Sequence, residues 1–180
     1  AIDSIMYDAL CIGNHDFDFG PSVLAEFISD ISVSQPTFLS ANLDFSNESD
    51  LQNLVNSGRI ASSTIINRDN YSVGVIGLTT SSLPFISSPG GVTVDPNYVS
   101  IVQSEITSLQ NNGVDKIILI SHLQGLDEEK ALIADLDDID IVIAGGGDEL
   151  LANPGDLLVP ESDGSFPTPD DSYPVKVADN

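Results

Sequence analysis

Short apolar runs of strand length recur along the chain and are separated by longer segments with helical periodicity. Several of these runs are nearly continuous rather than alternating, which favours strands that are buried on both faces of a sheet. The runs that we expect to form strands are ALCI (9–12), PTFLSAN (36–42), STIIN (63–67), YSVGVIGL (71–78), DKIILIS (115–121) and DIDIVIA (138–144).

Three segments place apolar residues at helical spacing, namely residues 21–31, 95–113 and 126–136. The first opens with Pro21, which is favoured in the first turn of a helix, and the second ends at Gly113. In the third, Asp127 is the expected N-terminal cap. The side chains that we expect to point inward are Leu24, Phe27, Ile28 and Ile31, then Val99, Val102, Ile106 and Leu109, and finally Leu132, Ile133 and Leu136.

The run STIINRDNYSVGVIGL reads as a β-hairpin that turns at Arg68-Asp69-Asn70. An antiparallel pair therefore accompanies the strand–helix units. Together they predict an α/β fold with mixed sheets.

The amino-acid composition changes after residue 151. Residues 152–174 hold five of the ten prolines, which is typical of a long excursion or linker, and a short strand is expected in residues 175–180. We therefore expect residues 1–151 to form the core of one domain.

The charge of the chain limits its partners. The 180 residues include 28 acidic and 5 basic ones, for a formal net charge of −23. Binding to nucleic acid or to an anionic membrane through a basic patch is therefore not expected. Cys11 is the only cysteine, so neither a disulfide framework nor a thiolate metal site is expected. The sequence shows no membrane span or signal peptide.

Both histidines of the chain follow expected strands. His15 comes after the first apolar run and His122 after the fifth, while Asp148 follows the sixth within GGGDE. The functional crevice of an open α/β sheet lies beyond the carboxyl ends of its strands. The candidate residues at these ends are Asn14, His15, Asp16, Asp18, His122 and Asp148, whose imidazole, amide and carboxylate groups suit Zn, Mn or Fe.

Simpler interpretations of the same residues stay open at this point. A histidine after a strand often caps or hydrogen-bonds the backbone, and GNHD contains residues that favour turns. GGGD can also be interpreted as only a tight connection between a strand and the next segment.

The motif GNHDFDFG resembles the Gly-Asn-His-Asp/Glu signature of the calcineurin-like metallophosphoesterases. Together with LSANL, VGVIGLTT and ILISHLQG in this order, it resembles the 5'-nucleotidase branch over about residues 5–147. The resemblance implies an α/β/β/α sandwich that hydrolyses phosphoesters, nucleotides among them, with two divalent metal ions. A small-molecule phosphoester is thus the expected partner.

The resemblance also assigns roles to individual residues. Asn14 and His122 match metal ligands of the family. His15 matches the histidine that steadies the transferring phosphoryl group and assists the leaving group, and Asp18 matches the acid that pairs with it. Asp16 matches a variable acidic position and receives no catalytic role.

Three departures from the family pattern stand out. No Asp-x-His motif occurs, and no Gly-Asp motif precedes residue 13, so we expect a catalytic domain that is incomplete at its N-terminus. Gly146 and Asp148 stand where the family has two histidines; Asp148 can still ligate a metal and Gly146 cannot. A nucleoside-binding C-terminal domain is not found in these residues, so the substrate cannot be read from them.

Two hypotheses follow. The first is a 5'-nucleotidase-like phosphoester hydrolase with residues His15 and Asp18 in catalysis and Asn14, His122 and Asp148 at the metals. The second is a non-catalytic binding or surface domain that has lost the dinuclear metal site. The resemblance further implies an extracytoplasmic protein whose signal peptide lies outside these residues.

Overall fold

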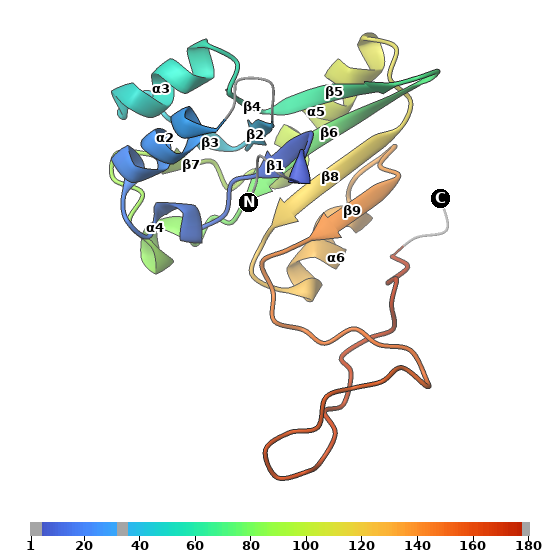
Figure 1. Cartoon of the computed structure of the whole chain (residues 1–180). Coiled ribbons are helices and arrows are strands. Elements are labelled where there is room, and N and C mark those ends of the chain that lie inside the picture. The colour runs from blue at the N-terminus through green and yellow to red at the C-terminus, as the bar shows by residue number, and fades with distance from the viewer. Residues whose placement is uncertain (1–4, 32–35, 178–180) are drawn as a thin grey trace.

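The apolar runs form strands in three sheets. The computed structural model describes residues 5–31 and 36–177. A parallel sheet contains β1 (Ala9–Cys11), β2 (Thr37–Leu39) and β4 (Ile60–Ala61). A mixed sheet has the order β5 (Ser63–Arg68), β6 (Tyr71–Thr79), β8 (Ile117–His122) and β9 (Ile141–Ala144), and a small antiparallel pair joins β3 (Leu43–Asp44) to β7 (Thr93–Val94) (Figure 1).

The mixed α/β class expected from the sequence is confirmed. Strands β5 and β6 form the expected antiparallel hairpin, in which Arg68 pairs with Tyr71, whereas β6, β8 and β9 run parallel. Burial on both faces holds for the last six residues of β6 but not for β9, because Ile141 and Ile143 are 54% and 51% exposed. Strand β9 lies at the edge of its sheet.

Five α-helices and one 3₁₀ helix are present among the described residues. They are η1 (His15–Phe17), α2 (Pro21–Asp30), α3 (Ser49–Asn56), α4 (Leu83–Ile86), α5 (Tyr98–Asn111) and α6 (Leu126–Ala134). Helices α3 and α4 were not expected from the periodicity, because each is short and buries one apolar side chain, Leu51 and Leu83 respectively. Helices α2, α5 and α6 confirm the three expected segments.

Two apolar cores hold these layers together. One core joins β1, β2, α2 and α3, and the other joins β6, β8, α5 and α6. The sheets approach each other at Gly77 in β6, where a Cβ atom would lie only 2.4 Å from the carbonyl oxygen of Leu39 in β2. This close contact positions the end of β6 beside the ends of β1 and β2.

Three details differ from the sequence expectations. Phe27 and Val99 are partly exposed rather than inward, although Phe27 still packs edge-on against Phe38 with ring centroids 6.2 Å apart. Helix α6 begins one residue before Asp127, and its first amide, that of Leu126, donates to Glu149 Oε1 at 2.9 Å. A residue from after β9 therefore fills the role expected of Asp127.

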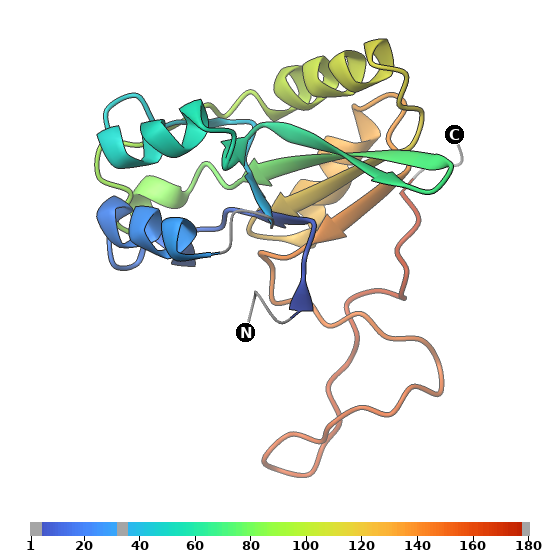
Figure 2. The ribbon, with the colours of Figure 1, turned by 45° about the horizontal axis from the view of Figure 1, so that its top comes forward.

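The C-terminal segment extends away from the sheets as a long loop (Figures 1 and 2). Leu151 forms an isolated parallel bridge with Asp171, and Lys130 of α6 forms a 2.6 Å ion pair with the same aspartate. The strand expected in residues 175–180 does not form in residues 175–177, and residues 178–180 lie outside the described part. No helix within residues 5–31 or 36–177 is long and apolar enough to cross a membrane.

Candidate metallophosphoesterase site

The loop after β1 carries most of the candidate site. Its backbone tightens into η1, whose Phe17 is fully buried while His15 and Asp18 remain exposed. The buried phenylalanine thus fixes the orientation in which the histidine faces outward. Asp16 accepts a 2.7 Å hydrogen bond from the amide of Gly13, which closes the turn.

Asn14 and His122 meet across 108 residues of sequence. His122 is the last residue of β8 rather than the first residue after it, and its Nε2 lies 2.8 Å from Oδ1 of the buried Asn14. The imidazole packs directly on Gly13, where a Cβ atom would lie 2.7 Å from the ring. The glycine of the Gly-Asn-His motif is therefore required by the position of His122.

The two groups have the chemistry of metal ligands. Partial burial lowers the pKa of His122, although the carboxylate of Asp16 acts in the opposite direction. The neutral imidazole, which is the form that binds metals, is therefore favoured. In this structure His122 Nε2 donates to Asn14 Oδ1. With the imidazole proton on Nδ1 instead, a nitrogen and an oxygen 2.8 Å apart could share one ion, because each ligand lies about 2.0–2.2 Å from a zinc ion.

The described residues supply this pair of donors but not a complete metal site. Nowhere in residues 5–31 and 36–177 do three or more His, Cys, Asp or Glu side chains gather as a metal-binding group. Asp148 is exposed, and no hydrogen bond or ion pair joins it to Asn14 or His122. Its role as a ligand stays a prediction.

The segment around Gly146 is closely packed against the end of β8. A Cβ atom at Gly146 would lie 1.8 Å from the carbonyl oxygen of Leu123, so this backbone conformation has no room for any side chain there. Position 146, where the family resemblance leads us to expect a histidine, therefore has no space for a side chain in this structure.

A second cluster surrounds His15. Its Nδ1 lies 2.7 Å from Oδ2 of Asp18, and the other carboxylate oxygen of Asp18 accepts a 2.9 Å hydrogen bond from Ser87 Oγ. The hydrogen bond and the negative charge of Asp18 raise the pKa of His15. His15 and Ser87 in turn lower the pKa of Asp18. The pair therefore favours a charged imidazole whose free ring nitrogen is available to a ligand.

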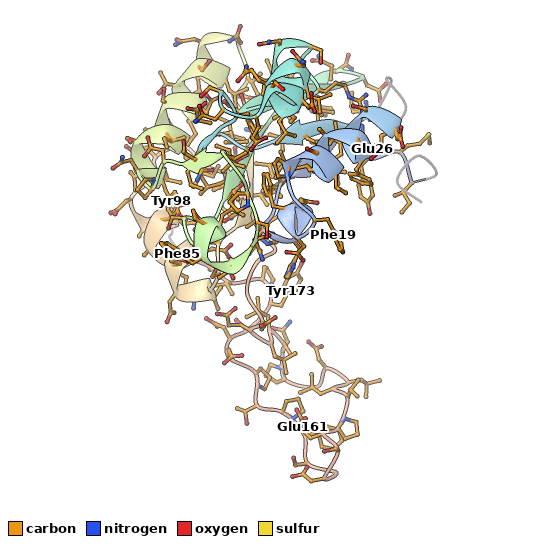
Figure 3. All side chains as sticks on the ribbon, turned by 90° about the vertical axis from the view of Figure 1, so that its left-hand side faces the viewer. Phe19, Glu26, Phe85, Tyr98, Glu161 and Tyr173 are labelled. Carbon is orange, nitrogen blue, oxygen red and sulfur yellow. The ribbon has the colours of Figure 1, made fainter. Side chains whose placement is uncertain are left out.

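Ser87 is a residue that sequence reasoning missed. It follows α4 and lies 69 residues from Asp18, so no local pattern connects the two. Phe85 of α4 and Phe19 after η1, which are close in sequence to Ser87 and Asp18 respectively, are exposed at the surface (Figure 3). The hydrogen bond between Ser87 and Asp18 ties α4 to the loop that carries His15.

Comparisons with known proteins agree with this geometry. No family model matches the chain. A 5'-nucleotidase from Diplobatis ommata is 32% identical over 151 residues, covering 83% of this chain and 25% of the relative. An apyrase from Anopheles gambiae is 32% identical over 171 residues, covering 94% of this chain and 29% of the relative.

Solved structures give the same result. The 5'-nucleotidase precursor from Thermus thermophilus superposes with a TM-score of 0.77 at 32% identity, covering 94% of this chain and 30% of that one. The calcineurin-like phosphoesterase YfkN from Bacillus subtilis shares the fold, with a TM-score of 0.63 at 21% identity over 81% of this chain and 46% of that one.

The fold, the Gly-Asn-His turn and these relatives define a calcineurin-like metallophosphoesterase, and the chain belongs to this superfamily. Within it, the chain belongs to the 5'-nucleotidase branch. The chain spans between a quarter and a third of the length of the 5'-nucleotidases and the apyrase compared above.

Proposed function

We propose that the protein hydrolyses phosphate monoesters of the nucleotide class in a reaction that depends on divalent metal ions. The observation that carries this proposal is the 2.8 Å contact between Asn14 and His122. Asn14 lies on the same turn as the His15–Asp18 pair. The names of the relatives, 5'-nucleotidase and apyrase, support the substrate class.

Asn14 and His122 would hold a metal ion, with Asp148 as a further proposed ligand. Zn, Mn and Fe all suit imidazole, amide and carboxylate donors, and two ions are expected from the family resemblance. Ions bound there supply the positive charge and the activated water that phosphoester hydrolysis requires.

The scarcity of basic side chains supports a metal as the source of this charge. The chain has five Lys and Arg residues. Within residues 5–31 and 36–177, Arg68 forms an ion pair with Asp8, Lys116 with Asp115, and Lys130 with Asp171. A phosphate dianion needs concentrated positive charge, and metal ions can provide it where Lys and Arg are few.

His15 would act on the leaving group. Its side chain is 80% exposed and held by Asp18, so the protonated ring can reach an oxygen atom of a bound ester. In that position it would donate a proton or a hydrogen bond to the departing oxygen. Asp18 keeps the ring charged and oriented, and Ser87 holds Asp18 in place.

The proposal is tested by the His15→Ala variant of the full-length gene product, assayed with AMP in the presence of added Mn²⁺ or Zn²⁺. Loss of a general acid should lower kcat by about 10²–10⁴-fold while the bound metal stays near the wild-type amount. Unchanged turnover in His15→Ala would reject the assignment of His15. Absence of metal-dependent hydrolysis in the wild type would reject the enzymatic function.

One observation favours a second candidate function. Gly146 has no room for a side chain, and the described residues hold no group of three acidic, histidine or cysteine ligands. A non-catalytic binding domain with the same fold agrees with both facts. The same assay separates the two functions, because a binding domain would show no turnover of AMP or p-nitrophenyl phosphate.

We further infer an extracytoplasmic location. The support for it is the strongly acidic composition together with the membership of the 5'-nucleotidase branch.

A further inference from the structure

A buried polar network lies directly beneath the turn that carries Asn14 and His15. It consists of Ser40, Asn42 and Thr79, which are all less than 5% exposed; the first two lie between β2 and β3, and Thr79 ends β6. Burying three polar side chains is costly unless each is hydrogen-bonded. Each of them is hydrogen-bonded, and the network ends on the backbone of Ile12, the residue that follows β1.

Thr79 is the member that reaches the site. It is the last residue of β6, and its Oγ1 donates to the carbonyl oxygen of Ile12 at 2.6 Å. The amide of Ile12 donates to Leu39 O at 3.0 Å. Ile12 is therefore held at both its amide and its carbonyl, one residue before Gly13 and two before Asn14.

Asn42 fixes the backbone of Thr79. Its Oδ1 accepts from the Thr79 amide at 2.9 Å and its Nδ2 donates to the Thr79 carbonyl at 2.7 Å, so the side-chain amide pairs with Thr79 as a neighbouring strand would. A further 3.3 Å bond from Nδ2 to Asp95 O fixes Asn42 itself.

The protons in this network can be assigned. The carbonyl oxygen of Ile12 can only accept, so the single hydroxyl proton of Thr79 points at it. Ser40 Oγ must then donate to Thr79 Oγ1 at 2.8 Å, and its single proton is shared with the longer, 3.2 Å contact to Asn42 Oδ1. The direction of donation runs from Ser40 through Thr79 to Ile12.

The geometry points to Thr79 as a positioning residue of the active site: its hydroxyl holds the carbonyl of Ile12 and thereby sets the place of Asn14 against His122 and of His15 against Asp18. Thr79 acts through the backbone and touches no substrate. Only the kinetic test of this inference rests on the proposed function.

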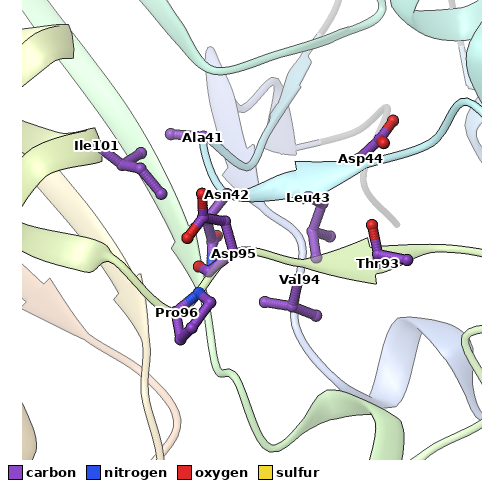
Figure 4. Close-up of a pocket in the computed structure, with 9 residues that line it drawn as sticks. All are labelled: Ala41, Asn42, Leu43, Asp44, Thr93, Val94, Asp95, Pro96 and Ile101. Carbon is purple, nitrogen blue, oxygen red and sulfur yellow. The ribbon is translucent and has the colours of Figure 1, made fainter.

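The test compares three variants that differ by single groups. Thr79→Val keeps the shape and removes the hydroxyl, whereas Thr79→Ser keeps the hydroxyl and removes the methyl. Thr80→Val is the matched control, because Thr80 is equally buried but its Oγ1 accepts from Ser82 of the following turn. Asn42 is less suitable, because it also lines an open cavity of about 500 Å³ with Asp44 and Asp95 (Figure 4).

The first readout is independent of activity. In NMR spectra of the chain, Thr79→Val should shift the signals of Gly13, Asn14, His15 and the His122 ring, Thr79→Ser should restore them, and Thr80→Val should leave them in place. Unmoved signals in Thr79→Val, or equal movement in Thr80→Val, would overturn the inference. If Thr79→Val does not fold, Thr79→Ala replaces it, because it also removes the hydroxyl that donates to Ile12; unmoved signals there would have the same consequence.

The second readout is kinetic. In the full-length gene product, Thr79→Val should lower kcat about tenfold to a hundredfold with little change in KM, since displacement of catalytic groups by about 1 Å has effects of this size. Thr79→Ser should recover most of the rate. If the wild type hydrolyses no phosphoester, the proposed function fails while the NMR comparison still decides the role of Thr79.

Discussion

At the scale of single residues, two glycines and one acid–histidine pair define what the site can do. Gly13 leaves space for the His122 ring, and Gly146 leaves space for the carbonyl of Leu123. His15 and Asp18 are three residues apart on one turn, so their contact depends mainly on local backbone structure. The pair between Asn14 and His122 instead depends on the whole sheet arrangement.

Replacing Gly146 by alanine should destabilise the fold. The new methyl group would collide with the Leu123 carbonyl, and the backbone must shift at a cost of about 1–3 kcal/mol in the free energy of unfolding. Gly145→Ala is the control, because its nearest neighbour would be Ser121 O at an ordinary 3.7 Å. Urea unfolding of both variants measures the difference, and equal stabilities would contradict the close packing at Gly146.

Asp18→Asn should lower the pKa of His15 toward its ordinary value of 6.5, because Asp18 is the main cause of the raised value. His15 would then lose its proton at a lower pH, and the basic limb of the pH–rate profile would move to lower pH as well. The chain has two histidines, so an NMR titration gives two curves.

The second curve belongs to His122, whose pKa the charge of His15 also affects. Asp163→Asn is the matched control, because Asp163 also accepts from a nearby serine, Ser165. If the pKa of His15 is the same in wild type and Asp18→Asn, the pairing of His15 with Asp18 does not exist in solution.

At the scale of elements, acidic side chains hold the turn between β8 and α6 and the helix that follows it. Glu149 accepts from the first amide of α6, and Glu129 of the same helix is buried against β8. Glu129 Oε1 and Ser121 Oγ are both buried. Burial, with Glu149 and Glu128 nearby, raises the pKa of Glu129 to about 7.

This raised pKa predicts a pH-dependent stability. Between pH 4.5 and 7 the folded chain binds more protons at Glu129 than the unfolded chain does, so the free energy of unfolding falls as pH rises through this window. Glu129→Gln should remove that loss and stabilise the protein at pH 8 by at most about 3 kcal/mol, with little effect at pH 4.

Glu128→Gln is the control for this prediction, because Glu128 is the exposed neighbour on the same helix. Thermal unfolding across the pH range measures both variants. A parallel pH dependence of Glu129→Gln and wild type would show that Glu129 ionises normally.

The sequence predicts those features that depend on local pattern or on strand order. The hairpin at Asp69, helices α2, α5 and α6, and the meeting of Asn14 with His122 at strand ends all follow from such patterns. Ser87, Thr79 and Glu149 act through contacts between segments 23 to 69 residues apart, and nothing in their own neighbourhoods indicates a partner. The exposure of β9 also depends on its position at the edge of the sheet, and the periodicity of the sequence does not reveal that position.

At the scale of the whole molecule, charge is the dominant property. A net charge of −23 disfavours anionic ligands unless cations are bound, so we expect a phosphate-binding site on this chain to depend on metal ions. The turn after β1 and the end of β8 bring the two donors together from opposite cores of the fold. We therefore expect the metal to link the parts of the domain built around the two apolar cores, in addition to its role in catalysis.

The most direct test of the central claim is the metal content of the full-length gene product, measured by plasma mass spectrometry in wild type and His122→Ala. Turnover of AMP is measured in the same samples before chelation, after chelation and after metal is restored. We predict that wild type retains metal, loses turnover on chelation and regains it, and that His122→Ala binds less metal and turns over AMP poorly. Equal metal content and equal turnover in the two proteins would show that Asn14 and His122 do not form the metal site.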